Sequence, residues 1–321
     1  MIISTLAAMT AGYILSVVLG TPRVISARRL IAALCNKLAP ALSGKYQDSD
    51  EGQHTGGVFY LVLVLLITLL PTALVLFLLY WKIPALAIAL DAVLCWSVSD
   101  IKTYSKYSQA AARNIRGAAP ERAARFAEKL SGCDCSELES EDIIRASVQG
   151  TADRTVDQAA APLLYMFILS GLGGVFFRAA DAASEIDLGS NTDAFLAPVR
   201  KLRNGLCFLP GKLAAAIMLV DGLFLKLDTR SGERVMKSDS RKCSRTAFGG
   251  CRAVLAGMMG ISLLPEEVFS AQFMRTYTIG EQVTDPDAKD ITISNQLMLG
   301  TAFILMVIFF ILKLTVGILL G

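Results

Sequence analysis

The sequence predicts an all-α, polytopic integral membrane protein with five to six transmembrane or re-entrant helices. The 321 residues are 54% hydrophobic and only 18% charged, and the mean hydropathy is +0.52. Soluble chains of this length are usually less apolar and more highly charged. The apolar residues are also gathered into long runs, which are separated by polar segments that carry most of the Lys and Arg residues. These observations favour a bundle of membrane helices with sizeable polar loops.

Six apolar runs approach the roughly 20 residues that a helix needs to cross a bilayer. The runs lie at 2–20, 58–80, 83–98, 159–177, 206–225 and 298–320. The third run is the shortest and contains Asp91, and we expect it to pack inside the bundle because a carboxylate facing lipid is costly. The fourth and fifth runs contain Gly or Pro residues. They therefore suit either crossing helices or re-entrant segments that line a polar cavity.

The polar segments between the runs predict the orientation of the chain. Of the 31 Lys and Arg residues, 24 lie in three alternate loops, which the positive-inside rule places in the cytoplasm. All three loops are long, and their cytoplasmic position predicts that both termini lie outside. We expect a helical loop over 99–158 and a basic, more irregular loop over 226–297. We treat 1–321 as a single membrane-embedded domain in the cell membrane. The net charge of +3 is small and the basic residues are spread out, which argues against a nucleic-acid partner.

A stripe of polar residues leads directly into the fourth apolar run. Its members recur at every fourth position, a spacing that places them on one face of an α-helix. The stripe consists of Arg145, Gln149, Asp153 and Asp157. Two carboxylates at the mouth of a membrane segment suit a shared Mg²⁺ ion or a substrate amine. The alternative is that Asp153 and Asp157 pair with arginines such as Arg154 on a solvated helix face.

The basic segment 242–252 is a second candidate site. It combines cations, the hydroxyl of Ser244 and two glycines ahead of a small-residue helix expected at 253–264. Cations together with the free backbone N–H groups of a helix N-terminus favour a phosphate site. The residues expected to bind phosphate are Lys242, Arg245, Gly249 and Arg252. The alternative is that this segment places positive charge beside anionic lipid.

An acidic group follows Arg178, where the fourth apolar run ends. Its members are Asp181, Glu185 and Asp187. We expect these carboxylates to solvate a loop, and a second set of cation ligands is the alternative.

Several short motifs occur in a characteristic order along the chain. They are Gly20-Thr21-Pro22-Arg23, Val148-Gln149-Gly150-Thr151-Ala152-Asp153-Arg154-Thr155-Val156-Asp157, Pro162-Leu163-Leu164-Tyr165, Phe177-Arg178-Ala179 and Ile279-Gly280-Glu281. In this order and at this membrane spacing they resemble the adenosylcobinamide-phosphate synthase family of cobalamin biosynthesis (CobD/CbiB). The central signature of that family reads Val-Glu-Thr-x-Ala-Glu-Asn-x-x-Asp. The resemblance covers nearly the whole chain and places the polar stripe within this signature.

The chain departs from the family pattern at several charged positions. Gln149 replaces the first Glu of the signature, and Arg154 replaces its Asn. Arg203-Asn204 stands where the family usually has two Asp residues, and Asp181 takes the place of an Asn. A Ser-Pro-Asn motif and the His before it are replaced by Cys243, Arg245 and Ala247. These departures indicate either a divergent member with a changed site or one that has lost the ligase reaction.

The resemblance implies a ligase that uses ATP and Mg²⁺ to join cobyric acid to aminopropanol or its phosphate, giving cobinamide or its phosphate. The implied partners are the corrinoid, the aminopropanol compound, the lipid bilayer and other membrane enzymes of the cobalamin pathway. On this basis the expected catalytic residues are Asp153, Asp157, Arg178 and Asp239, with Asp153 and Asp157 as metal ligands. The alternative is a catalytically lapsed member of the family that acts as a membrane scaffold or sensor.

Overall fold

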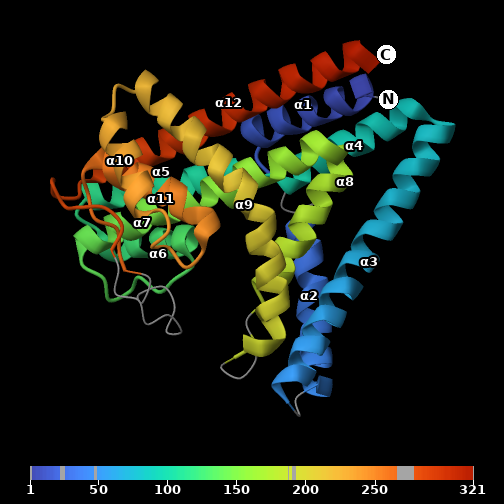
Figure 1. Cartoon of the computed structure of the whole chain (residues 1–321), viewed down its shortest axis with the longest axis horizontal. Coiled ribbons are helices and arrows are strands. Elements are labelled where there is room, and N and C mark those ends of the chain that lie inside the picture. Colours follow the sequence, from blue (N-terminus) through green and yellow to red (C-terminus); the bar gives the residue numbers. More distant parts are fainter. Residues whose placement is uncertain are drawn as a thin grey trace. The chain divides into compact units, whose positions relative to one another are not determined.

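The computed structural model describes residues 2–21, 26–46, 49–186, 188–189, 193–265 and 278–320. Every regular element in these residues is a helix, which confirms the predicted all-α class (Figure 1). Contacts divide the chain into two compact units, each built from segments that are far apart in the sequence. The first unit comprises Met1–Asp100, Ala161–Leu206 and Ile308–Gly321, and the second comprises Ile101–Ala160 and Cys207–Val307. That residues 1–321 form a single membrane-embedded domain stays a prediction.

The first unit contains the most apolar helices. They are α1 (Ile2–Val18), α2 (Ala27–Ser43), the 3₁₀ turn η1 (Gly44–Tyr46), α3 (Asp50–Lys82), α4 (Pro84–Val98), α8 (Ala161–Ser184), the beginning of α9 (Asp193–Phe224) and the end of α12 (Ala288–Leu320). Helix α1 packs along α4, and α8 packs against both α3 and α4 (Figure 1). Tyr60 of α3 and Phe195 of α9 pack together in one core cluster, with ring centroids 5.5 Å apart and ring planes tilted by 33°.

The second unit contains the shorter, amphipathic helices. They are α5 (Ile101–Arg116), α6 (Pro120–Ser131), α7 (Ser140–Arg154), the π-helical turn η2 (Thr155–Ala160), α10 (Thr229–Asp239), α11 (Thr246–Met259) and the remaining parts of α9 and α12. Helices α5, α6 and α7 pack on one another, α10 packs along α11, and α11 contacts α7. The prediction that 99–158 is helical is confirmed, and α6 begins at Pro120, whose fixed φ angle suits the first turn.

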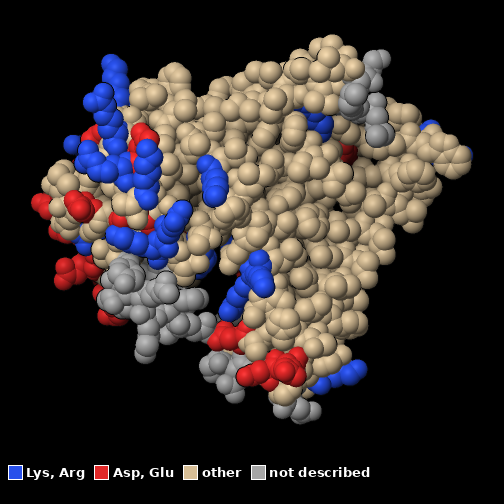
Figure 2. Space-filling view, viewed as in Figure 1, with Lys and Arg blue, Asp and Glu red and all other residues tan. Residues whose placement is uncertain are grey.

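Five helices of the described residues are long and apolar enough to cross a membrane, which agrees with the predicted five to six. The exposed surface of α3 is mainly apolar, and Figure 2 shows hardly any charged side chain on it between its two ends. Helix α1 is apolar but has only 17 residues. The prediction for Asp91 is also confirmed, since this residue of α4 is buried. These features indicate a multi-pass membrane protein, and its orientation stays a prediction.

Helix α8 is interrupted within the fourth apolar run. Leu169 and Ser170 leave the helical region of backbone conformation, and Ser170 has a φ of 53°, which is uncommon for a residue other than glycine. The interruption frees backbone groups that membrane lipid cannot satisfy. A polar side chain of the first unit supplies the missing partner, because Asp91 accepts a hydrogen bond from the amide of Gly171 at 2.8 Å.

Candidate functional site

The signature segment 148–157 is buried in the second unit, at the junction of α7 and η2. All residues from Ala146 to Ala160 are buried, although the signature contains six polar or charged side chains within its ten residues. The helix changes from α to π geometry at Thr155, and such π-helical turns occur frequently at functional sites. The charged side chains of this segment must therefore find partners within the protein.

Asp153 pairs with an arginine of the basic segment. Arg252 donates from Nε to Oδ1 of Asp153 and from Nη2 to Oδ2, and both distances are 2.7 Å. Two parallel hydrogen bonds fix the plane of the guanidinium group as well as its position. Arg252 also contacts the thiol of Cys243, with Nη1 3.5 Å from Sγ. The structure thus brings the signature and the basic segment together.

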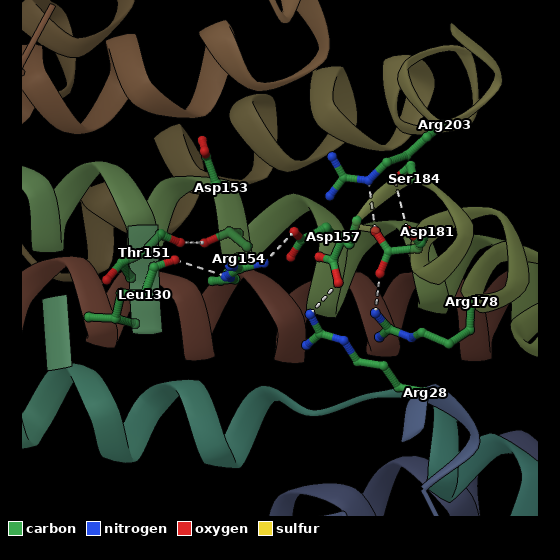
Figure 3. Close-up of polar contacts among 12 residues, drawn as sticks. Arg28, Leu130, Thr151, Asp153, Arg154, Asp157, Arg178, Asp181, Ser184 and Arg203 are labelled. Atoms are coloured by element: carbon green, nitrogen blue, oxygen red, sulfur yellow. Dashed lines mark hydrogen bonds and ion pairs between the residues drawn. The ribbon is translucent and has the colours of Figure 1, made fainter. Parts of the chain in front are cut away.

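Asp157 pairs with a different arginine. Arg154 donates from Nη1 to Oδ2 of Asp157 at 2.9 Å and from Nε to the carbonyl oxygen of Leu130 at 2.9 Å. Its guanidinium group also lies over the ring of Tyr104, 4.7 Å from the centroid. Figure 3 shows Arg154 and Asp157 pointing toward each other, whereas Asp153 projects away from this pair. The two carboxylates therefore belong to separate ion pairs.

Only part of the predicted stripe lies on one regular α-helical face. Because η2 is π-helical, Asp157 does not continue the regular α-helical spacing of Arg145, Gln149 and Asp153. Arg145 pairs instead with Asp142 at 2.8 Å, near the beginning of α7. The side chain of Gln149 is buried, and its Oε1 atom has no hydrogen-bond partner among the described residues.

The carboxylates of the signature do not fit a magnesium site as they are arranged. A divalent ion needs carboxylate oxygens that are available as ligands, but Arg252 bonds both oxygens of Asp153 and Arg154 bonds Oδ2 of Asp157. In the part of the chain that the structure describes, no three His, Cys, Asp or Glu side chains lie together as metal ligands would. We therefore assign no step of the chemistry to a metal held by these two residues.

The basic segment begins at the end of α10 and continues into α11. The small-residue helix begins at Thr246, earlier than expected, so Gly249 lies in its first turn rather than in the preceding loop. A Cβ atom at Gly249 would lie 2.1 Å from the carbonyl oxygen of Ser240, which shows that the glycine allows a close approach of two backbones. Its predicted role in binding phosphate stays a prediction.

Asp239 connects this segment to a loop that is distant in the sequence. Its carboxylate accepts from Lys242 at 2.8 Å and from the backbone amide of Gly280 at 3.0 Å. Burial acts to raise the pKa of Asp239, but these donors outweigh it and hold the pKa below its ordinary value. The side chain is therefore an anion at neutral pH that positions Lys242.

Three cations thus lie around the beginning of α11. Arg252 is paired with Asp153, and Arg245 interacts electrostatically with the same carboxylate. Lys242 is paired with Asp239. The amides of the first turn add the partial positive charge of a helix N-terminus. A phosphate or carboxylate group would be attracted to this position.

Arg178 lies in the first unit, at the centre of a second buried charge cluster. Arg178 and Asp181 are completely buried in α8, and Arg178 Nη1 donates to Asp181 Oδ2 at 2.8 Å. Arg203 of α9 donates to the other carboxylate oxygen at 2.7 Å. The Nε atom of Arg178 donates to the carbonyl oxygen of Val98 at 3.0 Å, and its Nη2 atom contacts the same oxygen. Figure 3 shows both arginines converging on Asp181.

The expectation that Asp181 solvates a loop is wrong. The residue is buried because α8 continues to Ser184, beyond the predicted end of the apolar run. Glu185 forms a partly exposed pair with Arg28 at 2.6 Å. Asp187 lies outside the described residues, as do Pro22 and Arg23 of the first motif.

Sequence reasoning found the cations of the basic segment and both aspartates of the signature, but it missed their arrangement. It did not pair Asp153 with Arg252, and it gave Arg203 no role. The resemblance held one signal for the second pair, because both residues depart from the family pattern. Arg203 gains positive charge there, and Asp181 gains negative charge. Two opposite changes of this kind indicate neighbouring positions.

Comparison with known proteins decides the family. The family model described as "CobD/Cbib protein" matches residues 9–298. The chain belongs to this family. The CobD relatives include a "Cobalamin biosynthesis protein CobD" of Leptospira interrogans, which is 24% identical over 286 residues, covering 86% of this chain and 88% of the relative. A protein of the same name from Geobacter metallireducens is 25% identical over 232 residues, covering 70% of this chain and 71% of the relative.

Another CobD relative matches a shorter part of the chain. A "Probable cobalamin biosynthesis protein CobD" of Methanothermobacter thermautotrophicus is 27% identical over 147 residues, covering 44% of this chain and 49% of the relative. No solved structure matches the chain. Membership of the CobD/CbiB family confirms the resemblance seen in the motifs and assigns the protein to an enzyme family of cobalamin biosynthesis.

Proposed function

We propose that the protein forms the amide bond that joins cobyric acid to aminopropanol or its phosphate, at the expense of ATP. The observation that carries this proposal is the bidentate pair between Asp153 and Arg252. It connects the family's signature to the basic segment, although the two residues are 99 positions apart. A substrate anion bound by the cations at the beginning of α11 would therefore lie against the signature.

The chemistry requires positive charge more than it requires a base. A propionate carboxylate of the corrinoid first accepts a phosphoryl group from ATP, and the neutral amine then attacks the carbonyl carbon and displaces phosphate. Both steps develop negative charge on oxygen, which fixed cations stabilise. We assign Lys242, Arg245 and Arg252 to the phosphate and carboxylate groups, with Gly249 in the first turn of the same helix.

The aspartates act mainly through the cations that they hold. Asp153 orients Arg252, Asp157 orients Arg154, and Asp239 positions Lys242. Removal of any of these carboxylates would leave a misplaced cation, and small misplacements are costly in catalysis. Arg178 is held in the same manner by Asp181 and is completely buried, so we propose that it acts by ordering the first unit rather than by touching a substrate.

Complementation of a cobalamin auxotroph that lacks its synthase tests the proposal. The wild-type protein is expected to restore growth, whereas Arg252→Lys should reduce cobinamide formation at least about tenfold, because lysine cannot donate two parallel hydrogen bonds to Asp153. Asp157→Ala should abolish rescue. Cys133→Ala is the control, since this partly exposed thiol donates its hydrogen bond to the hydroxyl of Ser131 at 2.8 Å, and it should rescue as the wild type does.

A catalytically lapsed scaffold or sensor is the second candidate. The observation in its favour is that both carboxylates of the signature are neutralised by arginines. If the wild-type protein reaches the membrane in normal amounts, binds the corrinoid and still fails to rescue, the ligase proposal is wrong and the scaffold is supported.

A further inference from the structure

The first unit contains a cavity that the proposed ligase site does not use. Its volume is about 310 Å³, and all of its lining residues belong to the first unit. They are Thr5, Leu76, Tyr80, Asp91, Ile168, Leu169, Ser170, Leu172 and Lys313. The cavity lies at the interruption of α8, so an irregular backbone lines it. Irregular backbone within a membrane segment is found where it borders a polar cavity.

The carboxylate of Asp91 is already satisfied by neutral donors. It accepts from the amide of Gly171 at 2.8 Å, from the hydroxyl of Ser170 at 2.7 Å and from the hydroxyl of Tyr80 at 3.1 Å. These three hydrogen bonds hold the carboxylate of Asp91 in place. They leave it little capacity to bind an added cation.

Lys313 lines the same cavity but, unlike Asp91, has few hydrogen-bond partners. The residue is only 7% exposed, although it lies within a membrane helix. Among the described residues its Nζ atom has one acceptor, the carbonyl oxygen of Met166 at the long distance of 3.5 Å. An ammonium group offers three donors. A buried ammonium with unused donors at the wall of a cavity is costly unless an acceptor occupies that cavity.

The cavity borders a surface that suits lipid. Ile168 and Leu169 line it and are 57% and 58% exposed, as expected of side chains that face acyl chains. Tyr80 lies two residues before the end of α3, and Asp91 lies seven residues after the beginning of α4. At 1.5 Å per residue the polar end of the cavity is therefore about 10 Å or less from the end of the helical hairpin. A lipid phosphate can reach this depth while its chains remain in the bilayer.

We propose that this cavity binds one phospholipid, whose phosphate oxygens accept hydrogen bonds from Lys313. The apolar walls receive the first carbons of the acyl chains. A soluble phosphate compound shares the phosphate chemistry but would not use the apolar mouth. This proposal does not depend on the ligase activity.

Native mass spectrometry of the full-length protein in detergent tests the proposal. The delipidated protein is titrated with a short-chain phosphatidylglycerol, with diacylglycerol of the same chains, and with glycerol 3-phosphate. We expect one phosphatidylglycerol to bind, and both other compounds to bind at least about tenfold more weakly. Lys313→Met should reduce phosphatidylglycerol binding by a similar factor. Lys82→Met removes an exposed lysine at the end of α3 and should change nothing.

A second variant tests the proposal independently, in case Lys313→Met does not fold. Ile168→Trp keeps the lysine and fills the mouth of the cavity, and the site tolerates a larger side chain because Ile168 is largely exposed. It should also displace the lipid. Undiminished binding to both variants, equal binding of diacylglycerol, or an equal loss in Lys82→Met would overturn the proposal. Equal binding of glycerol 3-phosphate would also overturn it, since the site would then take a soluble anion.

Discussion

At the scale of single residues, each altered charge of Arg154, Arg203 and Asp181 lies beside a charge of opposite sign. Arg154 stands in place of an Asn and pairs with Asp157. Arg203 stands in place of an Asp and pairs with Asp181, which itself stands in place of an Asn. An unpaired buried charge costs several kcal/mol, so Arg203 and Asp181 would each be harmful without the other, while Arg154 is balanced by Asp157, which the signature retains. The altered residues are better explained as compensated changes than as unrelated losses.

A double-mutant cycle at Asp181 and Arg203 tests this compensation. Asp181→Asn leaves two buried arginines without their carboxylate, and Arg203→Asp places two carboxylates together. Each single change should therefore lower the free energy of unfolding by about 3–5 kcal/mol. The double variant leaves one cation, Arg178, beside one carboxylate, and should cost at least about 1 kcal/mol less than the sum of the two. Thermal or denaturant unfolding in detergent measures the cycle.

A matched control lies on the same helix. Arg200 and Asp193 of α9 form an ion pair at 3.0 Å, but the two side chains are 45% and 48% exposed. Exposed pairs contribute only about 0–1 kcal/mol, so Arg200→Met should leave stability nearly unchanged. Additive effects at Asp181 and Arg203 would show that the two changes do not compensate each other.

The sequence identified the charged positions of the site but not their partners. Asp153 and Arg252 are separated by 99 residues, and helical spacing relates only residues within a few turns. The π-helical turn at Thr155 further separates Asp157 from the face that the four-residue spacing predicted. Such pairings depend on how helices pack, and one sequence does not contain that information.

At the scale of elements, the contact between α10 and α11 depends on a glycine that the sequence associated with phosphate. Gly249→Ala should lower the free energy of unfolding by about 1–3 kcal/mol, because its Cβ atom would lie 2.1 Å from the Ser240 carbonyl oxygen. Gly205→Ala in α9 is the control, since no atom lies within 4 Å of its Cβ position and alanine favours helix. A Gly249→Ala protein as stable as the wild type would contradict the close packing.

The loop that begins at Gly280 should respond to pH through Asp239. The folded-state pKa of Asp239 lies below its ordinary value of 3.8, so its stabilising effect is fully present above about pH 4 and is lost as the pH falls through the folded-state pKa. Asp239→Asn removes the charge. The wild type should therefore be more stable than Asp239→Asn at pH 7, by about 1–3 kcal/mol, and this difference should shrink below pH 4. Hydrogen exchange of the Gly280 amide over that pH range measures it, and a constant difference would contradict the assignment.

Element boundaries were predicted well where local chemistry decides them. The apolar runs at 58–80 and 298–320 lie within α3 and α12, and Pro120 begins α6. The beginning of α11 at Thr246 was placed too late, because Gly249 and Gly250 resembled a loop. Glycine lowers helix propensity, but at these positions it permits tight packing, which outweighs that preference.

At the scale of the whole molecule, the orientation of the spans decides whether the charged sites face the ATP that the proposed ligase reaction would use. The excess of Lys and Arg residues predicts that 99–158 and 226–297 are cytoplasmic. The same rule predicts that the segment from Arg178 to Gly205 lies outside if α8 and α9 both cross the membrane. Arg178 would then lie far from a cytoplasmic nucleotide, unless the interrupted α8 re-enters on the cytoplasmic side.

Cysteine labelling in intact cells distinguishes these arrangements. Six of the seven native cysteines are buried, so Cys133→Ala provides a background of low reactivity. Single cysteines at the exposed positions Glu137, Lys82 and Lys201 then report three segments. With a membrane-impermeant maleimide we expect labelling at Lys82 but not at Glu137, which should react only after permeabilisation. Protection at Lys201 together with Glu137 would show that α8 or α9 re-enters, and would place Arg178 on the side of ATP. Labelling at Glu137 in intact cells would contradict the predicted orientation.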